Sequence, residues 1–145
     1  MAGYKKVLLA LDFHADNEVL IEKAKAVADQ YQAELFLIHV QEPIAAAYTA
    51  DGFAFNEQLA SSHGAIRQEA RGRMDKMAER FGLSADRMIL AEGNPSDEIH
   101  AAVDDKGIDL IILGTHGQKG LRLLLGSTAN SVLHGVTCDV LTIRL

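Results

Sequence analysis

The sequence is poor in cysteine, proline and long apolar runs, and these absences exclude several protein classes. A single cysteine, Cys138, cannot form an internal disulfide, which predicts a protein of a reducing compartment. Apolar runs such as Leu110–Leu113 are far shorter than the roughly 18 residues of a membrane-spanning helix. The apolar stretch near Met1 closes at Asp12 without a small-residue cleavage site. We therefore expect neither a signal peptide nor membrane insertion.

Length and composition indicate one globular unit. The chain has 145 residues, 48% hydrophobic and 23% charged, so we expect a single domain over residues 1–145. The formal net charge of -6 argues against nucleic-acid binding over the whole surface. Acidic and basic side chains are interleaved over residues 67–80, which predicts a solvated helix face rather than a nucleic-acid patch.

Five short apolar runs have the length and content of strands buried on both faces of a parallel sheet. Helical patterns alternate with them, and parallel strands joined by right-handed helical crossovers form a three-layer α/β sandwich. The predicted strands are Lys6–Leu11, Glu34–Val40, Met88–Ala91, Asp109–Leu113 and Asp139–Ile143.

Local signals mark the helices between these strands. Asn94 is a capping residue followed by proline, which predicts a helix start there, and Gly107 predicts its end. Another helix is expected from near Ser127 to about His134. The longest predicted helix spans about 57–81, and its apolar stripe is Leu59, Ile66, Ala70, Met74, Met77 and Phe81. The stretch Gln41–Asn56 before it is predicted to be irregular, as either a functional flap or a mobile insertion.

Ligands of open parallel sheets bind beyond the carboxyl ends of the strands, so the residues that follow each strand are the candidates. Asp12 follows the first strand, with His14 close behind. A carboxylate there can accept hydrogen bonds from ribose hydroxyls or hold Mg²⁺ through water. The same position equally suits a helix cap or a surface acid.

The most informative stretch follows the fourth strand and is rich in glycine. Gly114 and Gly117 remove side chains where backbone could approach a ligand, and Gly126 precedes the predicted helix that begins near Ser127. A helix N-terminus with free N–H groups favours anions. No acidic residue occurs between Gly114 and Cys138, and the stretch carries Lys119 and Arg122. The pattern favours phosphate binding, with a glycine-rich turn as the alternative.

Other common chemistries lack their motifs. The sequence has neither the P-loop pattern nor the dinucleotide fingerprint after its first strand, and no G-x-S-x-G hydrolase motif. The six histidines show no metal-binding spacing. We expect His39 to be a hydrogen-bonded core residue, His63 and His100 to lie on helix surfaces, and Cys138 to be buried and inert.

Several motifs in order resemble the universal stress protein family. They are the start KKVLLALDF, the strand ELFLIHV, the turn GNPSDEI, the strand DLIILGTHG and the tail LLLGSTANSVLHGVTCDVLTIRL. The resemblance spans nearly the whole chain, and it is to the ATP-binding type of the family. It implies a Rossmann-like five-stranded parallel sheet of order 3-2-1-4-5, similar to adenine nucleotide alpha hydrolases. It also implies a cytoplasmic homodimer that pairs through its C-terminal strand.

The resemblance also implies an ATP site, carried over by position. Ala10 and Asp12 would line the adenosine end, with Asp12 the candidate Mg²⁺ contact, and the Val40 backbone would meet adenine. Leu113, Gly114 and Gly117 would flank the ribose and phosphates, and the phosphates would be held by Gly126, Ser127, Thr128 and Ala129.

One feature departs from the family pattern. The family usually places nine residues between the second and third glycines, and here Gln118 to Leu125 are eight. The resemblance therefore fixes no contact from Gln118 or Lys119, while all three glycines and Ser127 are retained.

These observations favour an ATP-binding protein of the stress response, in which nucleotide occupancy acts as a regulatory switch. No general base stands near the predicted γ-phosphate, so any ATPase activity is expected to be slow or dependent on an unknown protein partner. The alternative is a nucleotide-independent dimeric interaction module. An ATP-using adenylyl transferase is disfavoured because its HIGH and KMSKS-type elements are absent.

Overall fold

The computed structural model describes residues 3–11, 17–41, 52–115 and 131–144. Five strands form one parallel sheet of order β3-β2-β1-β4-β5, which confirms the predicted α/β class and strand order. The strands are β1 (Lys6–Ala10), β2 (Glu34–Gln41), β3 (Met88–Glu92), β4 (Leu110–Thr115) and β5 (Asp139–Arg144). Each begins within one residue of its predicted start, because the apolar runs correspond to strands with both faces covered.

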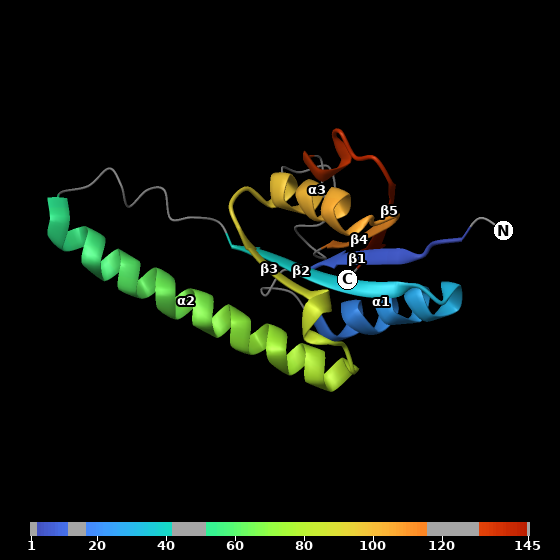
Figure 1. Cartoon of the computed structure of the whole chain (residues 1–145), viewed down its shortest axis with the longest axis horizontal. Coiled ribbons are helices and arrows are strands. Elements are labelled where there is room, and N and C mark those ends of the chain that lie inside the picture. The colour runs from blue at the N-terminus through green and yellow to red at the C-terminus, as the bar shows by residue number, and fades with distance from the viewer. Residues whose placement is uncertain (1–2, 12–16, 42–51, 116–130, 145) are drawn as a thin grey trace.

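Helices cover both faces of the sheet (Figure 1). The helices α1 (Asn17–Tyr31) and α2 (Gly52–Phe81) lie on one face, and α3 (Pro95–Lys106) and the helical residues 131–133 lie on the other. A short 3-10 helix, Ala85–Arg87, leads into β3. Alternate strand residues supply the two cores, so Val7 and Leu9 pack with α1 and Leu8 with α3.

The ends of α3 follow the predicted capping chemistry. The Asn94 side chain accepts hydrogen bonds from the backbone N–H groups of Ser96 (3.1 Å) and Asp97 (3.2 Å), and Pro95 opens the helix. Gly107 ends the helix with a left-handed φ of 70°. Both ends of α3 are therefore fixed by local sequence.

The asparagine cap gives a direct stability prediction. We expect Asn94→Ala to lower the free energy of unfolding by about 1 kcal/mol, because two helix N–H groups lose their acceptor. Urea unfolding followed by circular dichroism measures this change. Gln30→Ala, at an exposed position of α1, is the control and should change stability by no more than a few tenths of a kcal/mol. Equal losses in the two variants would contradict the capping role.

The long helix α2 differs from its prediction at its N-terminal end. It begins at Gly52 rather than near residue 57, because residues 52–56 contain no proline and continue the helical pattern. The predicted irregular stretch therefore shortens, and residues 42–51 of it lie outside the described part of the chain. Ala70 and Met74 are buried as predicted, but Ile66 is 44% exposed. Figure 1 shows that the N-terminal part of α2 projects past the sheet.

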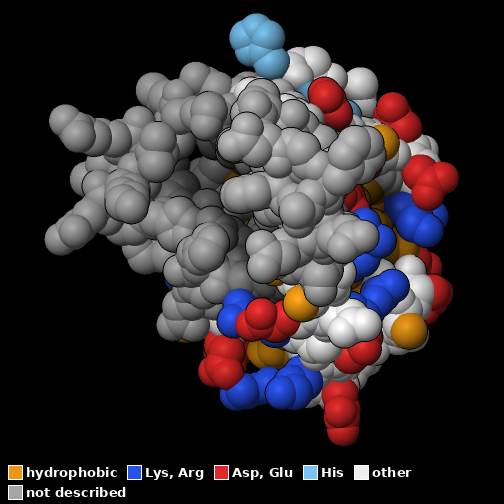
Figure 2. Space-filling model, turned by 90° about the vertical axis from the view of Figure 1, so that its left-hand side faces the viewer, with side chains coloured by type: hydrophobic (Ala, Val, Ile, Leu, Met, Phe, Trp, Pro, Cys, Tyr) orange, Lys and Arg blue, Asp and Glu red, His pale blue; other side chains and the backbone are white. Residues whose placement is uncertain are grey.

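The surface of the described residues carries both signs of charge. Figure 2 shows Lys and Arg side chains next to Asp and Glu side chains on the coloured part of that face, with small areas of hydrophobic side chain between them. The charged residues of α2 between 67 and 80 are exposed, as the prediction of a solvated face required. Within the described ranges, no helix is both long and apolar enough to cross a membrane.

Candidate functional site

The candidate site lies where the strand order changes direction. From β1 the chain moves outward to β2 and β3, and then returns to place β4 on the other side of β1. The carboxyl ends of β1 and β4 are adjacent, with Ala10 opposite Leu113 in the register. Such a switch point is where open α/β sheets bind ligands.

The strand β1 ends earlier than both of its neighbours, and we call the step that this forms in the edge of the described sheet the recess. Its last register pairs are Ala10 with Ile38 on β2 and Ala10 with Leu113 on β4. Beyond these pairs, β2 continues through Gln41 and β4 through Thr115. At about 3.3 Å per residue, β2 extends roughly 10 Å past the end of β1.

The backbone of Val40 borders this recess. The Leu11 N–H donates to the Ile38 carbonyl at 2.8 Å, so the Ile38 carbonyl points toward β1. Alternate residues of a strand direct their backbone groups to the same side, so the Val40 N–H and C=O also point that way. Because the pairing with β1 stops at Ala10, no strand among the described residues occupies that side of Val40. Val40 therefore offers one donor and one acceptor at the recess.

The side chains beside these groups are apolar or absent. Ala10 and Val40 are half-buried and pack against the cluster that contains Ile38 and Leu113, on the α3 face of the sheet. Gly114 follows Leu113 on β4 and is also half-buried. The described part of the recess thus presents apolar surface next to the backbone N–H and C=O of Val40.

The structure brings four of the predicted site residues together and leaves the rest undescribed. Ala10, Val40, Leu113 and Gly114 meet at the carboxyl ends of β1, β2 and β4. The other predicted residues lie outside the described part of the chain: Asp12, Gly117, Gly126, Ser127, Thr128 and Ala129, together with His14, His116, Gln118 and Lys119. The undescribed segments 12–16 and 116–130 follow β1 and β4 directly in the sequence.

Comparison with known proteins identifies the family. A model of the universal stress protein family matches residues 3–144. The chain belongs to the universal stress protein family. It is 40% identical over 147 residues to the universal stress protein A homolog 2 of Coxiella burnetii, an alignment that covers 100% of this chain and 98% of that protein.

Solved structures of other family members share the fold. The universal stress protein MJ0577 of Methanocaldococcus jannaschii superposes with a TM-score of 0.78 at 25% identity, covering 99% of this chain and 98% of that one. A universal stress protein crystallised in complex with cAMP superposes with a TM-score of 0.59 at 20% identity, and each chain is covered to 98%.

Two histidines of this universal stress protein bond to backbone carbonyls. His39 is half-buried, and its Nδ1 lies 3.2 Å from the Leu11 carbonyl, which agrees with its predicted role. His100 was predicted to lie on a helix surface, and it is half-buried on α3. Its Nε2 lies 2.7 Å from the carbonyl of Val132, which is buried against α3. Each ring nitrogen donates here, because a carbonyl oxygen only accepts.

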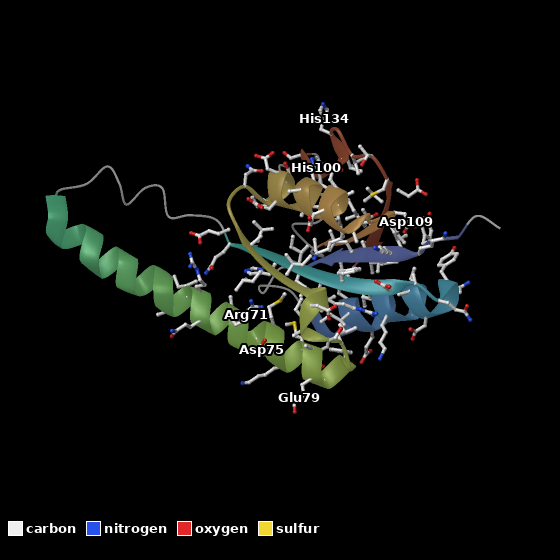
Figure 3. The ribbon with its side chains drawn as sticks, viewed as in Figure 1. Arg71, Asp75, Glu79, His100, Asp109 and His134 are labelled. Carbon is white, nitrogen blue, oxygen red and sulfur yellow. The ribbon has the colours of Figure 1, made fainter. Side chains whose placement is uncertain are left out.

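Two other candidates in the described part of the chain, His134 and Cys138, are not placed as reactive groups. His134 points away from the body of the molecule (Figure 3). Cys138 is a half-buried free thiol, and burial raises the pKa of that thiol, with Asp139 and Asp109 adding to the shift. A raised pKa keeps the thiol protonated and weakens it as a nucleophile. Among the described residues no three His, Cys, Asp or Glu side chains group as metal ligands, and Asp12 lies outside them.

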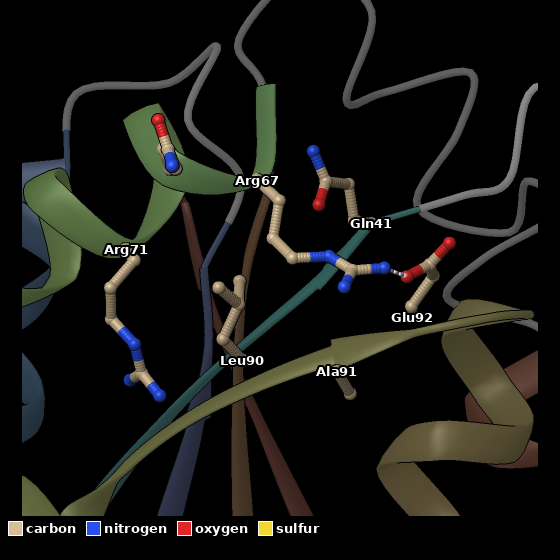
Figure 4. Close-up of a pocket in the computed structure, with 7 residues that line it drawn as sticks. Gln41, Arg67, Arg71, Leu90, Ala91 and Glu92 are labelled. Atoms are coloured by element: carbon tan, nitrogen blue, oxygen red, sulfur yellow. Dashed lines mark hydrogen bonds and ion pairs between the residues drawn. The ribbon is translucent and has the colours of Figure 1, made fainter. Parts of the chain in front are cut away.

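Sequence reasoning missed a second cavity, which lies between α2 and the end of β3. It measures about 470 Å³ and is lined by Gln41, Arg67, Gln68, Arg71, Leu90, Ala91 and Glu92 (Figure 4). The interleaved charges of residues 67–80 indicated only a solvated helix face, because nothing in the sequence places two of its arginines opposite a strand end 20 residues later.

Proposed function

We propose that this universal stress protein binds an adenine nucleotide in the recess at the carboxyl end of β1. The observation that carries the proposal is the open backbone edge of Val40 beside the switch point between β1 and β4. An adenine ring has a flat apolar face and a donor–acceptor edge, and the described part of the recess offers matching surfaces.

Each predicted residue then has a specific role. The Val40 N–H and C=O bind the adenine edge, while Ala10 and Leu113 contact the ring or the ribose. Asp12 accepts from ribose hydroxyls or holds Mg²⁺ through water. Gly114 and Gly117 admit the ligand close to the backbone. The phosphates lie at the start of the next helix, against Gly126, Ser127, Thr128 and Ala129.

ATP with Mg²⁺ is the nucleotide that the chain favours. The stretch from Gly114 to Cys138 carries Lys119 and Arg122 and no acid, which suits a polyphosphate. The family member crystallised with cAMP supports an adenine nucleotide as the class of ligand. We propose a role as a nucleotide-dependent switch of the stress response in the cytoplasm rather than an enzyme, with ATP hydrolysis slow at most, because no general base is assigned near the γ-phosphate.

We further propose that the protein acts as a homodimer paired through β5. This strand is at the end of the sheet, so one of its backbone edges pairs with no other described strand. Its Leu141 is 37% exposed. Pairing β5 with a second copy covers this edge and satisfies its hydrogen bonds.

The first test is the nucleotide that the protein carries through purification. Purified protein is denatured, the released small molecules are separated by anion-exchange chromatography, and the emptied protein is titrated with Mg-ATP by calorimetry. Released ATP or ADP and saturable rebinding are expected. If no nucleotide is released and no heat is measured with ATP, ADP, AMP or cAMP, the alternative of a nucleotide-independent interaction module is favoured.

A further inference from the structure

We propose that the cavity between α2 and the end of β3 is a second ligand site, which takes a small organic monocarboxylate. Its lining contains a guanidinium and a buried amide, neither of which has a partner among the described residues, and apolar surface from β3. This combination suits a carboxylate on a flat apolar body with a polar group at its other end.

The net charge of the lining selects a monoanion. Arg67 forms an ion pair with Glu92, and in Figure 4 its side chain reaches along the cavity to that carboxylate. Arg71 also lines the cavity, and among the described residues it has no ion-pair partner. Two arginines and one glutamate leave a formal charge of about +1, which one carboxylate neutralises. A single guanidinium fork also matches a carboxylate in two-point geometry.

Gln41 supplies the second, independent observation. It is 9% exposed and is one of two buried polar residues in the described part of the chain. Its backbone carbonyl accepts from the Gly93 N–H at 3.0 Å, but its side-chain amide has no partner among the described residues. A buried amide left without hydrogen bonds costs stability, unless something in the cavity bonds to it.

The remaining lining is apolar and suits a ring. Leu90 of β3 is half-buried and lines the cavity, while Ala91 borders it with a side chain that packs on the α3 face. The arginine methylene stems add further apolar surface. A volume of about 470 Å³ lies within the range of small-molecule sites. A ligand that fits would bind Arg71 through its carboxylate, place its ring over Leu90 and form a hydrogen bond to Gln41 through a hydroxyl group.

The cavity is distinct from the proposed nucleotide recess. Gln41 follows Val40 on β2, so their side chains lie on opposite faces of the sheet. Val40 packs on the α3 face, whereas the cavity is closed by α2. The two sites share a strand end but no side chain. The carboxylate proposal therefore stands or falls independently of nucleotide binding.

The experiment is a titration of the full-length protein with 4-hydroxybenzoate, followed by ¹H–¹⁵N NMR. We expect saturable shifts of the Gln41 side-chain amide and the Arg71 Nε–H signals, and no such shifts with the neutral analogue 4-hydroxybenzamide. Arg71→Gln should weaken 4-hydroxybenzoate binding at least tenfold. The matched control is Arg73→Gln, on the same helix and ion-paired to Glu69 outside the cavity, which should leave affinity unchanged.

A second variant separates binding from structure. Gln41→Leu removes the amide, which has no partner within the described ranges, at similar volume. We therefore expect it to weaken 4-hydroxybenzoate binding while the protein melts at the same or a higher temperature. Equal shifts with acid and amide, or unchanged affinity in Arg71→Gln, would overturn the proposal. Displacement of 4-hydroxybenzoate by saturating Mg-ATP would also overturn it, since the cavity would then belong to the nucleotide site.

Discussion

Gly126→Val is expected to abolish Mg-ATP binding, with a loss of at least a hundredfold in affinity. The proposed phosphate site uses backbone N–H groups at the start of the helix that the sequence predicts after Gly126. A valine side chain there occupies space that the phosphates need and separates them from these N–H groups. Each lost charge-assisted hydrogen bond is worth about 1.5–3 kcal/mol, and two such losses exceed a hundredfold. Calorimetric titration of the nucleotide-free protein measures the change.

A matched glycine variant shows whether the effect belongs to the site. Gly64 lies on an exposed part of α2, and a Cβ added there meets no atom within 4 Å. Gly64→Val should therefore keep both the wild-type melting temperature and the wild-type affinity. If Gly126→Val binds Mg-ATP with wild-type affinity, the assignment of the phosphate site to Gly126 is wrong. A lowered melting temperature in that variant without nucleotide would mean that the glycine serves the fold.

The sequence predicted the sheet well because each strand is an apolar run with both faces covered. Lys6–Leu11 and Glu34–Val40 could occupy few other environments, and β1 and β2 form at those positions. The end of α3 at Gly107 was equally predictable, since its left-handed φ of 70° suits glycine. The edge of the recess followed from the same pattern, because ligands of such sheets bind where the strands end.

What the sequence could not predict depends on contacts between distant segments. Ile66 fits the apolar stripe of α2, yet it is exposed. His100 carries no local signal that its ring bonds to a carbonyl 32 residues later. Gln41 was assigned to the irregular stretch, although it closes β2 and its side chain is buried in a cavity. Helical periodicity gives the face of a residue, but not the length over which that face is covered.

Leu141→Glu is expected to convert the proposed homodimer into a monomer. Leu141 lies on β5 opposite Ile112 of β4, and β5 ends the sheet. A glutamate in the middle of this strand would meet its own copy across a two-fold axis, and like charges facing each other oppose strand pairing. The residue is 37% exposed in a single chain, so the substitution should leave the monomer folded.

Sedimentation at micromolar concentration measures the outcome. The wild-type protein should sediment near 31 kDa, twice the 15.7 kDa of one chain, and Leu141→Glu near the mass of one chain. Val19→Glu is the control, because Val19 is 41% exposed on α1, away from β5. This substitution adds the same charge without contacting the edge of β5. If Leu141→Glu remains a dimer, the interface lies elsewhere. If the wild-type protein sediments as a monomer, the dimer proposal is wrong. If dimer formation also strengthens when Mg-ATP is added, the nucleotide recess and β5 are coupled through β4, which borders both.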